Sequence, residues 1–316
     1  MLALHFDGRS ARVADVAPPA SEPGSALVRV ALAGVCDTDL QIVRGYMGFR
    51  GVLGHEFVGR VEAGPEEWLG QRVVGEINFA CERCPVCRAG LPRHCPTRRV
   101  MGIQEADGAF AELLQVPVAN LHAVPDPVSD AAAVFCEPLA AAFEILEQVE
   151  IEPGLDTVVL GDGKLGLLVA QVLRNAGARV RVVGRHPAKL ALLERLEIET
   201  VLADDWQPAA TSLVVEATGS REGLDRAVAA VRPRGTIVLK STVADTAVFD
   251  FAPLVIHEIR VVGSRCGPFP PALAALAAGA VTVEPLIHDR FPLARADEAL
   301  RSAGSRGRLK VLVEPG

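Results

Sequence analysis

The sequence predicts an α/β protein of two domains, one built mainly of short strands and one built around a parallel sheet. Residues 1–124 contain short Val-rich segments broken by Gly and Pro, a texture typical of irregular β structure. Between residues 156 and 264, β-type and helical segments alternate, which is typical of a parallel sheet covered by helices on both faces. The chain has 316 residues, and one domain is usually shorter than this.

The N-terminal strands are expected where β-branched residues gather between turn residues, at 27–35, 57–63 and 71–77. Few helical periods occur among them, so residues 1–124 are expected to form a β-barrel-like domain. The pattern changes after this point. Helices are predicted over 129–135, with Ser129 as a helix cap, and from Pro138, because proline suits a first helical turn.

The second domain is predicted over residues 125–264, with a doubly wound sheet. Its strands are expected at 156–161, 179–184, 212–219 and 235–241, and its helices at 164–177, 187–196 and 224–231. Residues 265–316 contain two short helical segments, near 270–278 and 295–302, and a strand at 309–315. They are too few to form a third core, so we expect them to pack back against the N-terminal domain.

Composition excludes several classes of protein. The net charge of −7 argues against a general phosphate-binding surface for nucleic acid. No stretch of about eighteen uncharged apolar residues could span a bilayer, and the first ten residues have no secretion-signal pattern. We therefore expect a cytoplasmic protein that acts on a small molecule and engages neither nucleic acid nor membrane.

Four of the seven cysteines fall within fifteen residues, spaced Cys-x2-Cys-x2-Cys-x7-Cys, as Cys81, Cys84, Cys87 and Cys95. Short loops of this kind supply four thiolates to a tetrahedral zinc. Because no coordination position would remain for water, this zinc would be structural. Unconnected buried thiols, a disulfide pair or an iron–sulfur cluster are the alternatives that spacing leaves.

A second group of metal-ligand residue types lies outside this lobe of residues 81–95, as Cys36, His55, Glu56 and Glu137. A cysteine, a histidine and a carboxylate suit a catalytic zinc, which keeps one position open. Spacing alone does not decide the matter, because no short loop ties these residues together. Cys136, beside Glu137, is interpreted as a packed thiol.

A glycine-rich turn follows the first strand of the second domain, with Gly161, Gly163 and Gly166 around Lys164 and Leu165. This G-x-G-x-x-G stands between a strand and a helix, which is the context of dinucleotide binding. The glycines let the backbone approach a pyrophosphate at the helix N-terminus. A tight turn without a ligand is the alternative.

The end of the next strand predicts which nicotinamide dinucleotide is bound. NAD-binding proteins usually carry an acid there for the ribose, whereas this chain has Gly184 followed by Arg185, His186 and Lys189. An arginine can bind a 2′-phosphate, which a carboxylate would repel. NADP(H) is therefore favoured over NAD(H), with a solvated basic loop as the alternative.

The order of these motifs resembles the zinc-containing medium-chain dehydrogenase/reductases, the alcohol dehydrogenase superfamily. GVCDTDL, then GHE nineteen residues after the cysteine, the four-cysteine lobe, EPLA and the glycine turn cover nearly the whole chain. The Glu-Pro-Leu-Ala form looks like the sorbitol, threonine and sugar dehydrogenase branch. The resemblance implies a GroES-like catalytic domain over 1–124 and 265–316, and a Rossmann cofactor domain over 125–264.

The resemblance also implies the roles of individual residues. Cys36, His55 and Glu137 would bind the catalytic zinc, and Glu56 would be an alternate ligand or a nearby carboxylate. Thr38 matches a hydroxyl that accepts the alcohol proton, and Asp39 matches a carboxylate that orients the histidine. This chain departs from many relatives at Gln41, where they carry a histidine that passes the proton to solvent.

The implied function is hydride transfer between an alcohol, such as a secondary alcohol, polyol or sugar, or its carbonyl product and a nicotinamide cofactor. Zinc would polarise the oxygen, Thr38 would relay the proton, and each chain would hold two zinc ions. Tyr46, Met47 and Phe49 either line the substrate pocket or pack the barrel. The family is usually dimeric or tetrameric. A zinc-free enoyl or quinone reductase of the same fold, and a non-catalytic NADP(H) sensor, are the rival functions.

Overall fold

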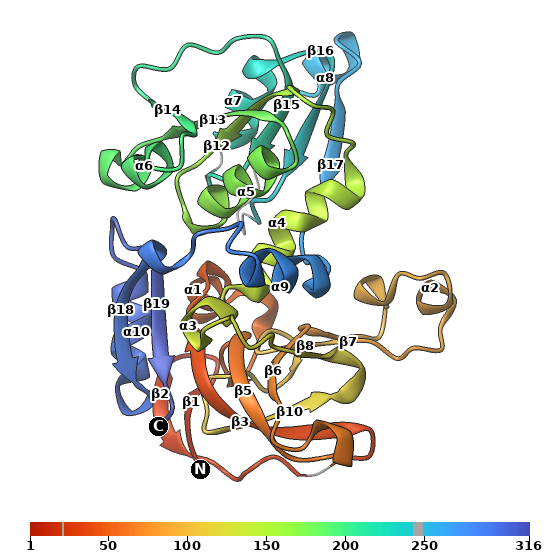
Figure 1. Cartoon of the computed structure of the whole chain (residues 1–316), viewed down its shortest axis with the longest axis vertical. Coiled ribbons are helices and arrows are strands. Elements are labelled where there is room, and N and C mark those ends of the chain that lie inside the picture. The colour runs from red at the N-terminus through yellow and green to blue at the C-terminus, as the bar shows by residue number, and fades with distance from the viewer. Residues whose placement is uncertain (21, 221, 243–248) are drawn as a thin grey trace. The chain divides into compact units, whose positions relative to one another are not determined.

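The computed structural model describes residues 1–20, 22–220, 222–242 and 249–316. It divides into a first unit, Met1–Glu137 with Ala272–Gly316, and a second unit, Pro138–Pro271 (Figure 1). The sequence placed the limits earlier, at 124/125 and 264/265. The short helix α3 (Asp130–Ala133) contacts β3 and β5, which explains why residues just beyond 124 belong with the first unit.

The first unit is a set of β-sheets. The largest has the order β11-β6-β5-β3-β19-β18, with β10 also paired to β3, and two three-stranded sheets, β2-β1-β4 and β7-β8-β9, accompany it. The strands are β1 (Leu2–Phe6), β2 (Ala11–Asp15), β3 (Ser25–Gly34), β4 (Gly51–Val52), β5 (Glu56–Ala63), β6 (Arg72–Gly75), β7 (Asn78–Phe79), β8 (Arg99–Met101), β9 (Glu105–Ala106), β10 (Leu113–Pro117), β11 (Leu121–Ala123), β18 (Ile287–Pro292) and β19 (Lys310–Glu314).

Strand β3 is the centre of the large sheet. Its buried residues alternate, as Ala26, Val28, Val30 and Leu32, because a strand points successive side chains to opposite faces. It pairs antiparallel with β5, β10 and β19. The C-terminal strand β19 therefore returns to the N-terminal sheet, as the sequence predicted.

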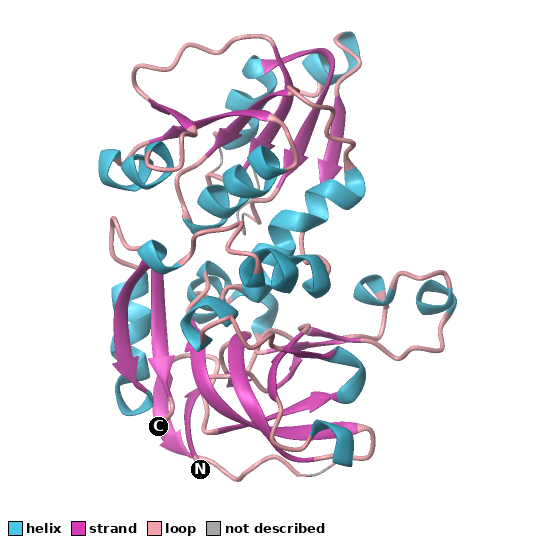
Figure 2. Cartoon of the chain, in the orientation of Figure 1, coloured by secondary structure: helices cyan, strands magenta, loops and turns pink. Residues whose placement is uncertain are grey.

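The second unit is a parallel sheet with helices on both faces, in the order β14-β13-β12-β15-β16-β17 (Figure 2). This is a doubly wound order. Its strands are β12 (Asp156–Leu160), β13 (Arg179–Gly184), β14 (Glu199–Leu202), β15 (Thr211–Glu216), β16 (Val231–Leu239) and β17 (Arg260–Gly263). Strands β14 and β17 were not among the predicted strands.

Ten α-helices complete the described parts of both units. They are α1 (Asp37–Val43), α2 (Pro85–Arg88), α3, α4 (Cys136–Gln148), α5 (Lys164–Asn175), α6 (Pro187–Glu194), α7 (Gly223–Ala230), α8 (Ala252–Ile256), α9 (Phe269–Ala277) and α10 (Ala296–Ala303). The apolar face of α7 packs on β15 and β16 around Val214 and Ile237. Within the described ranges, none of these helices is long and apolar enough to cross a membrane.

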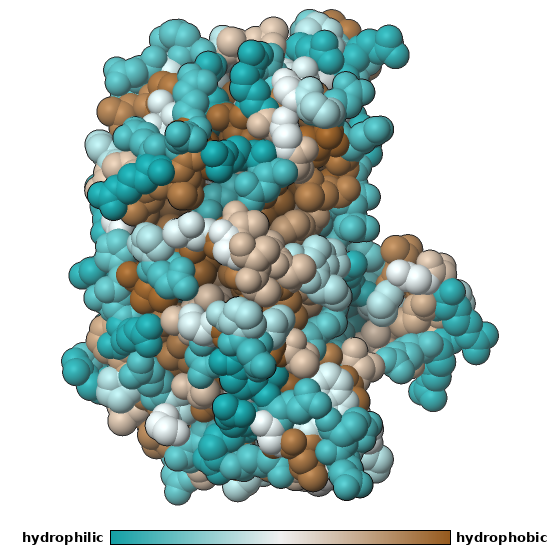
Figure 3. Space-filling model, in the orientation of Figure 1, coloured by the Kyte–Doolittle hydropathy of each residue, from teal (hydrophilic) through white to brown (hydrophobic). Residues whose placement is uncertain are grey.

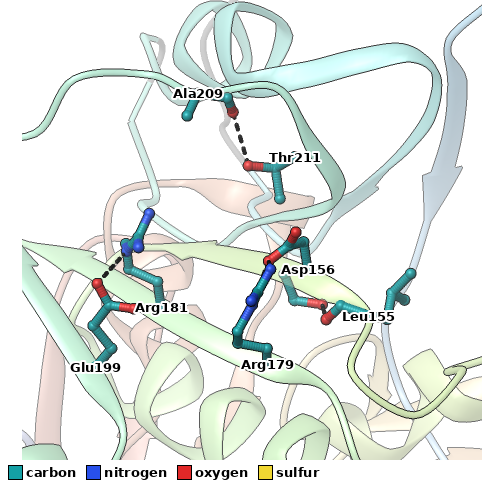
Figure 4. Close-up of polar contacts among 8 residues, drawn as sticks. Leu155, Asp156, Arg179, Arg181, Glu199, Ala209 and Thr211 are labelled. Atoms are coloured by element: carbon teal, nitrogen blue, oxygen red, sulfur yellow. Dashed lines mark hydrogen bonds and ion pairs between the residues drawn. The ribbon is translucent and has the colours of Figure 1, made fainter.

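Exposed ion pairs link neighbouring strands at the amino end of the parallel sheet (Figure 4). Arg179 pairs with Asp156, its register partner across β12 and β13, and Arg181 pairs with Glu199 across β13 and β14. Such pairs contribute little to stability. The opposite, carboxyl end of the sheet carries the glycine turn, which is where doubly wound sheets bind ligands.

Candidate functional site

Cys36 and Glu56 are brought together by the register of two strands. Gly34, the last residue of β3, lies opposite Glu56, the first residue of β5. Cys36 follows β3 as the N-cap of α1, and the Asp39 carboxylate accepts a hydrogen bond of 2.9 Å from the Cys36 backbone N–H. A Cβ on Gly34 would collide with the Glu56 carboxylate, so this glycine leaves room for the acid.

The Cys36 sulfur, a His55 ring nitrogen and a Glu56 carboxylate oxygen all lie within 4.8 Å of one another. His55 and Glu56 are buried. Asp39, also buried, places its Oδ1 3.3 Å from Nδ1 of His55, which holds the imidazole in one orientation. The Thr38 hydroxyl lies 3.6 Å from the Cys36 sulfur.

Polar atoms of this group are buried without hydrogen-bond partners among the described residues. Burial by itself lowers the pKa of His55, but the charges of Asp39 and Cys36 outweigh it and hold that pKa well above its usual range. Glu56 Oε1 is buried without a hydrogen-bond partner, an arrangement that is unfavourable unless something else pairs with the oxygen. A half-buried sulfur with a buried imidazole and a buried carboxylate fits a zinc ion.

The carboxylate beside Cys36 and His55 is therefore Glu56, whereas the sequence favoured Glu137. Glu137 lies in the first turn of α4 and is partly exposed, and it is not in the group of three. Its role as a ligand stays a prediction. Burial raises the pKa of the neighbouring Cys136 thiol well above its usual range, which fits a packed thiol.

Lys310 is a residue of this site that the sequence did not single out. It begins β19, is fully buried, and donates a hydrogen bond from Nζ to Glu56 Oε2. Its ammonium also lies 5.3 Å from the centre of the Phe135 ring. Lysine is rare in this chain, which has four. A lysine within the apolar predicted strand at 309–315 was therefore the feature of the sequence that could have identified this residue.

The sulfur atoms of the four lobe cysteines lie close together. The Sγ–Sγ distances are 3.5 Å for Cys84–Cys87, 4.0 Å for Cys84–Cys95 and 3.5 Å for Cys81–Cys95. A tetrahedral zinc with bonds of about 2.3 Å needs thiolates about 3.8 Å apart, whereas a disulfide needs about 2.05 Å. The arrangement fits one metal ion and excludes the disulfide alternative.

Backbone N–H groups favour the thiolate at Cys81, whereas burial opposes it at Cys87. Hydrogen bonds from the backbone of Arg83 and Cys84 lower the pKa of Cys81 to about 6. Burial and the neighbouring Cys84 raise the pKa of Cys87 to about 12. Helix α2 and its loops extend away from β7 and β8, and the visible face of this lobe mixes hydrophilic and hydrophobic residues (Figure 3).

The glycine turn has the close contacts that its sequence pattern predicts. A Cβ on Gly161 would collide with the Ala217 carbonyl, and one on Gly166 would collide with the Gly161 carbonyl. A Cβ on Gly163 would meet nothing within 4 Å, so the backbone is open to a ligand at the N-cap of α5. This cradle fits a pyrophosphate. Lys164 and Leu165 begin the helix.

The residues at the end of β13 are arranged differently from the basic cluster that the sequence suggested. Arg185 is exposed, His186 is partly exposed and Lys189 is buried. The Asp162 carboxylate, from the glycine turn, accepts hydrogen bonds from the backbone N–H groups of Arg185 and His186. The sequence interpretation overlooked Asp162, although an acid between the first two glycines was visible.

The expected substrate-pocket residues have different environments. Phe49 is buried in the core, whereas Met47 is exposed and has φ of 61°. Tyr46 is partly exposed and begins a short 3-10 helix. The alternative that these residues pack the barrel thus holds for Phe49.

Known proteins resemble the whole chain. Residues 22–126 match the alcohol dehydrogenase GroES-like domain, and residues 165–278 match the zinc-binding dehydrogenase domain. D-altritol 5-dehydrogenase of Agrobacterium fabrum is 31% identical over 86% of this chain and 86% of that protein. Sorbitol dehydrogenase of Halalkalibacterium halodurans is 28% identical over 94% of each.

Two solved structures are similar throughout. A protein of Sinorhizobium meliloti 1021, assigned as a zinc-binding dehydrogenase and bound to NADP, has a TM-score of 0.91 and 29% identity, with 99% of each chain covered. An alcohol dehydrogenase of Escherichia coli CFT073, in complex with NADH, has a TM-score of 0.91 and 26% identity, again with 99% of each chain covered.

Proposed function

We propose that this chain, which belongs to the medium-chain family of zinc-binding alcohol dehydrogenases, oxidises one hydroxyl of a polyol or sugar, or catalyses the reverse reduction. The reaction class follows from the family: the chain is an oxidoreductase that transfers hydride between an alcohol and a nicotinamide cofactor. The observation that supports a zinc-dependent reaction is the convergence of the half-buried Cys36 with the buried His55 and Glu56.

In this proposal, Cys36 and His55 bind the catalytic zinc, with a carboxylate as the third ligand. A zinc ion held there would act as a Lewis acid toward the substrate oxygen. Asp39 orients the imidazole from 3.3 Å, which fixes which ring nitrogen faces the metal. Glu56, which is adjacent to both ligands, is our choice of carboxylate over Glu137.

Thr38 is proposed to accept the alcohol proton. Its hydroxyl lies 3.6 Å from the sulfur of Cys36, so a substrate oxygen at the metal would lie within its reach. The neighbouring Gln41 cannot titrate. The proton therefore passes from the Thr38 hydroxyl to water or to another group, and not to the side chain at position 41.

A second zinc per chain is proposed for the four-cysteine lobe, because its thiolates lie at the separations of a tetrahedral site. This ion would have no open position, so it would stabilise the lobe and take no part in the reaction. The cytoplasmic location and the homodimer or homotetramer stay predictions.

A nicotinamide cofactor at the glycine turn would supply the hydride chemistry. The sequence predicted NADP(H), with its 2′-phosphate bound by Arg185, His186 and Lys189, and this preference remains a prediction. Relatives bind either form, as the NADP and NADH complexes above illustrate. The contacts of Asp162 bear on the choice and are considered in the next subsection.

The substrate class is proposed from the relatives, whose names include D-altritol and sorbitol dehydrogenases. The test is turnover of zinc-loaded protein on a panel of polyols, sugars and simple alcohols, followed by the absorbance of the reduced cofactor. Oxidation of polyols that stops when the metal is chelated, and resumes when zinc returns, would support the proposal. Reduction of enoyl or quinone substrates by fully chelated protein, without alcohol oxidation, would favour the zinc-free reductase instead.

A further inference from the structure

The carboxylate of Asp162, in the glycine turn, is buried and makes several polar contacts with the end of β13. The residue is 7% exposed. Its Oδ2 accepts hydrogen bonds of 2.7 Å from the backbone N–H of Arg185 and 2.6 Å from that of His186. The His186 ring adds a contact of 3.0 Å from Nδ1. Two backbone N–H donors and the contact with the His186 ring thus hold one carboxylate between the glycine turn and the end of β13.

Gly184 is required at the end of β13 because Asp162 fills the space beside it. A Cβ on Gly184 would lie 2.6 Å from both Cβ and Oδ2 of Asp162. Any side chain at position 184 would start inside the space of that carboxylate. The acid that usually ends this strand is therefore replaced by one from the neighbouring loop, and the negative charge is retained at the strand end.

The same contacts occupy the groups that a 2′-phosphate would use. The two backbone N–H groups that follow Gly184 already donate to Asp162. His186 is paired with the same carboxylate, and Lys189 is buried in α6. Arg185 remains as the exposed cation of the three. A phosphate would have to compete with a fixed carboxylate for the same donors, and like charges repel at this range.

We infer that Asp162 is the residue that selects the cofactor, and that it favours NAD(H) over NADP(H) by offering a carboxylate to the adenosine ribose. A carboxylate accepts hydrogen bonds from ribose hydroxyls and repels a phosphate on them. This inference is the opposite of the NADP(H) preference predicted from the missing acid at position 184, and the binding measurement below decides between the two. It rests on the proposed function insofar as a nicotinamide dinucleotide binds at the glycine turn.

The experiment measures the dissociation constants of NADH and NADPH with the full-length protein, from the change in cofactor fluorescence and without any alcohol. The wild type should bind NADH more tightly than NADPH by about tenfold or more. Asp162→Asn keeps the size and removes the charge, so the ratio should move toward NADPH by about tenfold or more. Asp156→Asn, an exposed acid at the far end of β12, is the control and should leave the ratio unchanged.

A pair of variants tests the position of the acid independently of its removal. Gly184→Asp should bind both cofactors poorly, because two carboxylates would compete for one space. The double variant Asp162→Gly with Gly184→Asp returns the acid to the strand end, so binding of NADH and the preference for it should recover. Failure of the double variant to bind NADH better than Gly184→Asp alone would overturn the inference.

The outcomes separate this inference from the proposed function. Wild-type protein that binds both cofactors but prefers NADPH, or an Asp162→Asn protein with an unchanged ratio, would refute the role of Asp162 and leave hydride transfer standing. Wild-type protein that binds neither cofactor would refute the proposed function, and the role of Asp162 with it. Because binding is read without turnover, loss of zinc does not mimic any of these results.

Discussion

Lys310 and Glu56 form an ion pair whose side chains are 0% and 1% exposed. The lysine comes from the C-terminal strand β19, and the acid comes from β5 and belongs to the group of candidate zinc ligands. One carboxylate thus has two tasks. Its Oε2 accepts a hydrogen bond from the Lys310 ammonium. Its Oε1 is buried without a hydrogen-bond partner in the protein and is available to a metal.

Breaking this pair from the lysine side should destabilise the protein strongly. In the metal-free protein, Lys310→Met leaves the Glu56 carboxylate buried and uncompensated, which typically costs about 3–5 kcal/mol in the free energy of unfolding. Urea unfolding followed by circular dichroism measures it. The double variant Lys310→Met with Glu56→Gln should recover part of the loss, since neither of the two positions then carries a charge. Equal losses in the single and double variants would show that the pair is not the cause.

Metal content should distinguish the two candidate carboxylates. We expect two zinc ions per chain in the wild type and one after Cys36→Ser. Glu56→Gln should lower retention of the second ion during dialysis against a weak chelator, and Glu137→Gln should lower it less. Elemental analysis by mass spectrometry gives the counts. The reverse order of the two glutamine variants would identify Glu137 as the ligand, as the sequence originally suggested.

Removing the Thr38 hydroxyl should impair turnover without loss of metal. Thr38→Val keeps the branched shape, so zinc content and cofactor affinity should stay at wild-type values. The rate should fall by about 10²–10⁴, because a positioned proton acceptor is lost. Thr38→Ser retains the hydroxyl and serves as the matched variant, with most activity preserved. Steady-state rates on the best substrate decide the matter, and an active Thr38→Val enzyme would show that the proton takes another route.

The cysteines of the metal-free lobe should differ in reactivity. Hydrogen bonds from the backbone lower the pKa of Cys81 from 9.0 to about 6, whereas that of Cys87 is raised to about 12. The thiolate is the reactive form, so iodoacetamide at pH 7 should label Cys81 well before Cys87. Labelling of Cys81 should slow as the pH falls below about 6. Peptide mass spectrometry after chelation reports the order, and simultaneous labelling would contradict it.

The same shift fixes how the lobe responds to acid. The pKa of Cys81 is lower in the folded lobe than in an ordinary thiol, which titrates near pH 9. The Cys81 thiolate therefore contributes its full stabilisation to the folded lobe at pH values above about 9. That contribution declines as the pH falls from about 9 and is lost below about 6. Protons and zinc compete for the sulfur, so zinc release from the lobe should increase over the lower part of this range.

The sequence predicted an element correctly where a local pattern of residues determines that element. The alternation of Val-rich and helical segments predicted β12, α5 and β13, and the glycine turn was placed correctly between the first two. Strands β14 and β17 were missed because they are short and partly exposed, so neither shows a buried run. The four-cysteine lobe was predicted for the same reason as the turn, since all its residues are near in sequence.

Features that depend on pairing across the chain were less accessible. Glu56 stands beside Cys36 because β3 and β5 pair in one register, and no spacing rule states that register. Lys310 reaches Glu56 from 254 residues away. Asp162 lies within the glycine motif, but its contacts are made with the end of β13. Those residues come close to Asp162 only in the folded sheet.

Synthesis imposes an order on the assembly of this protein, because β19 inserts beside β3 and its lysine meets Glu56. While the ribosome is translating residues 272–309, the second unit is already synthesised, but the sheet next to Cys36 and His55 still lacks β19. The second unit can collapse around its own core during this interval, since domains fold as they emerge. A nascent chain stalled before residue 310 would thus carry a folded second unit and a Glu56 carboxylate without its lysine partner.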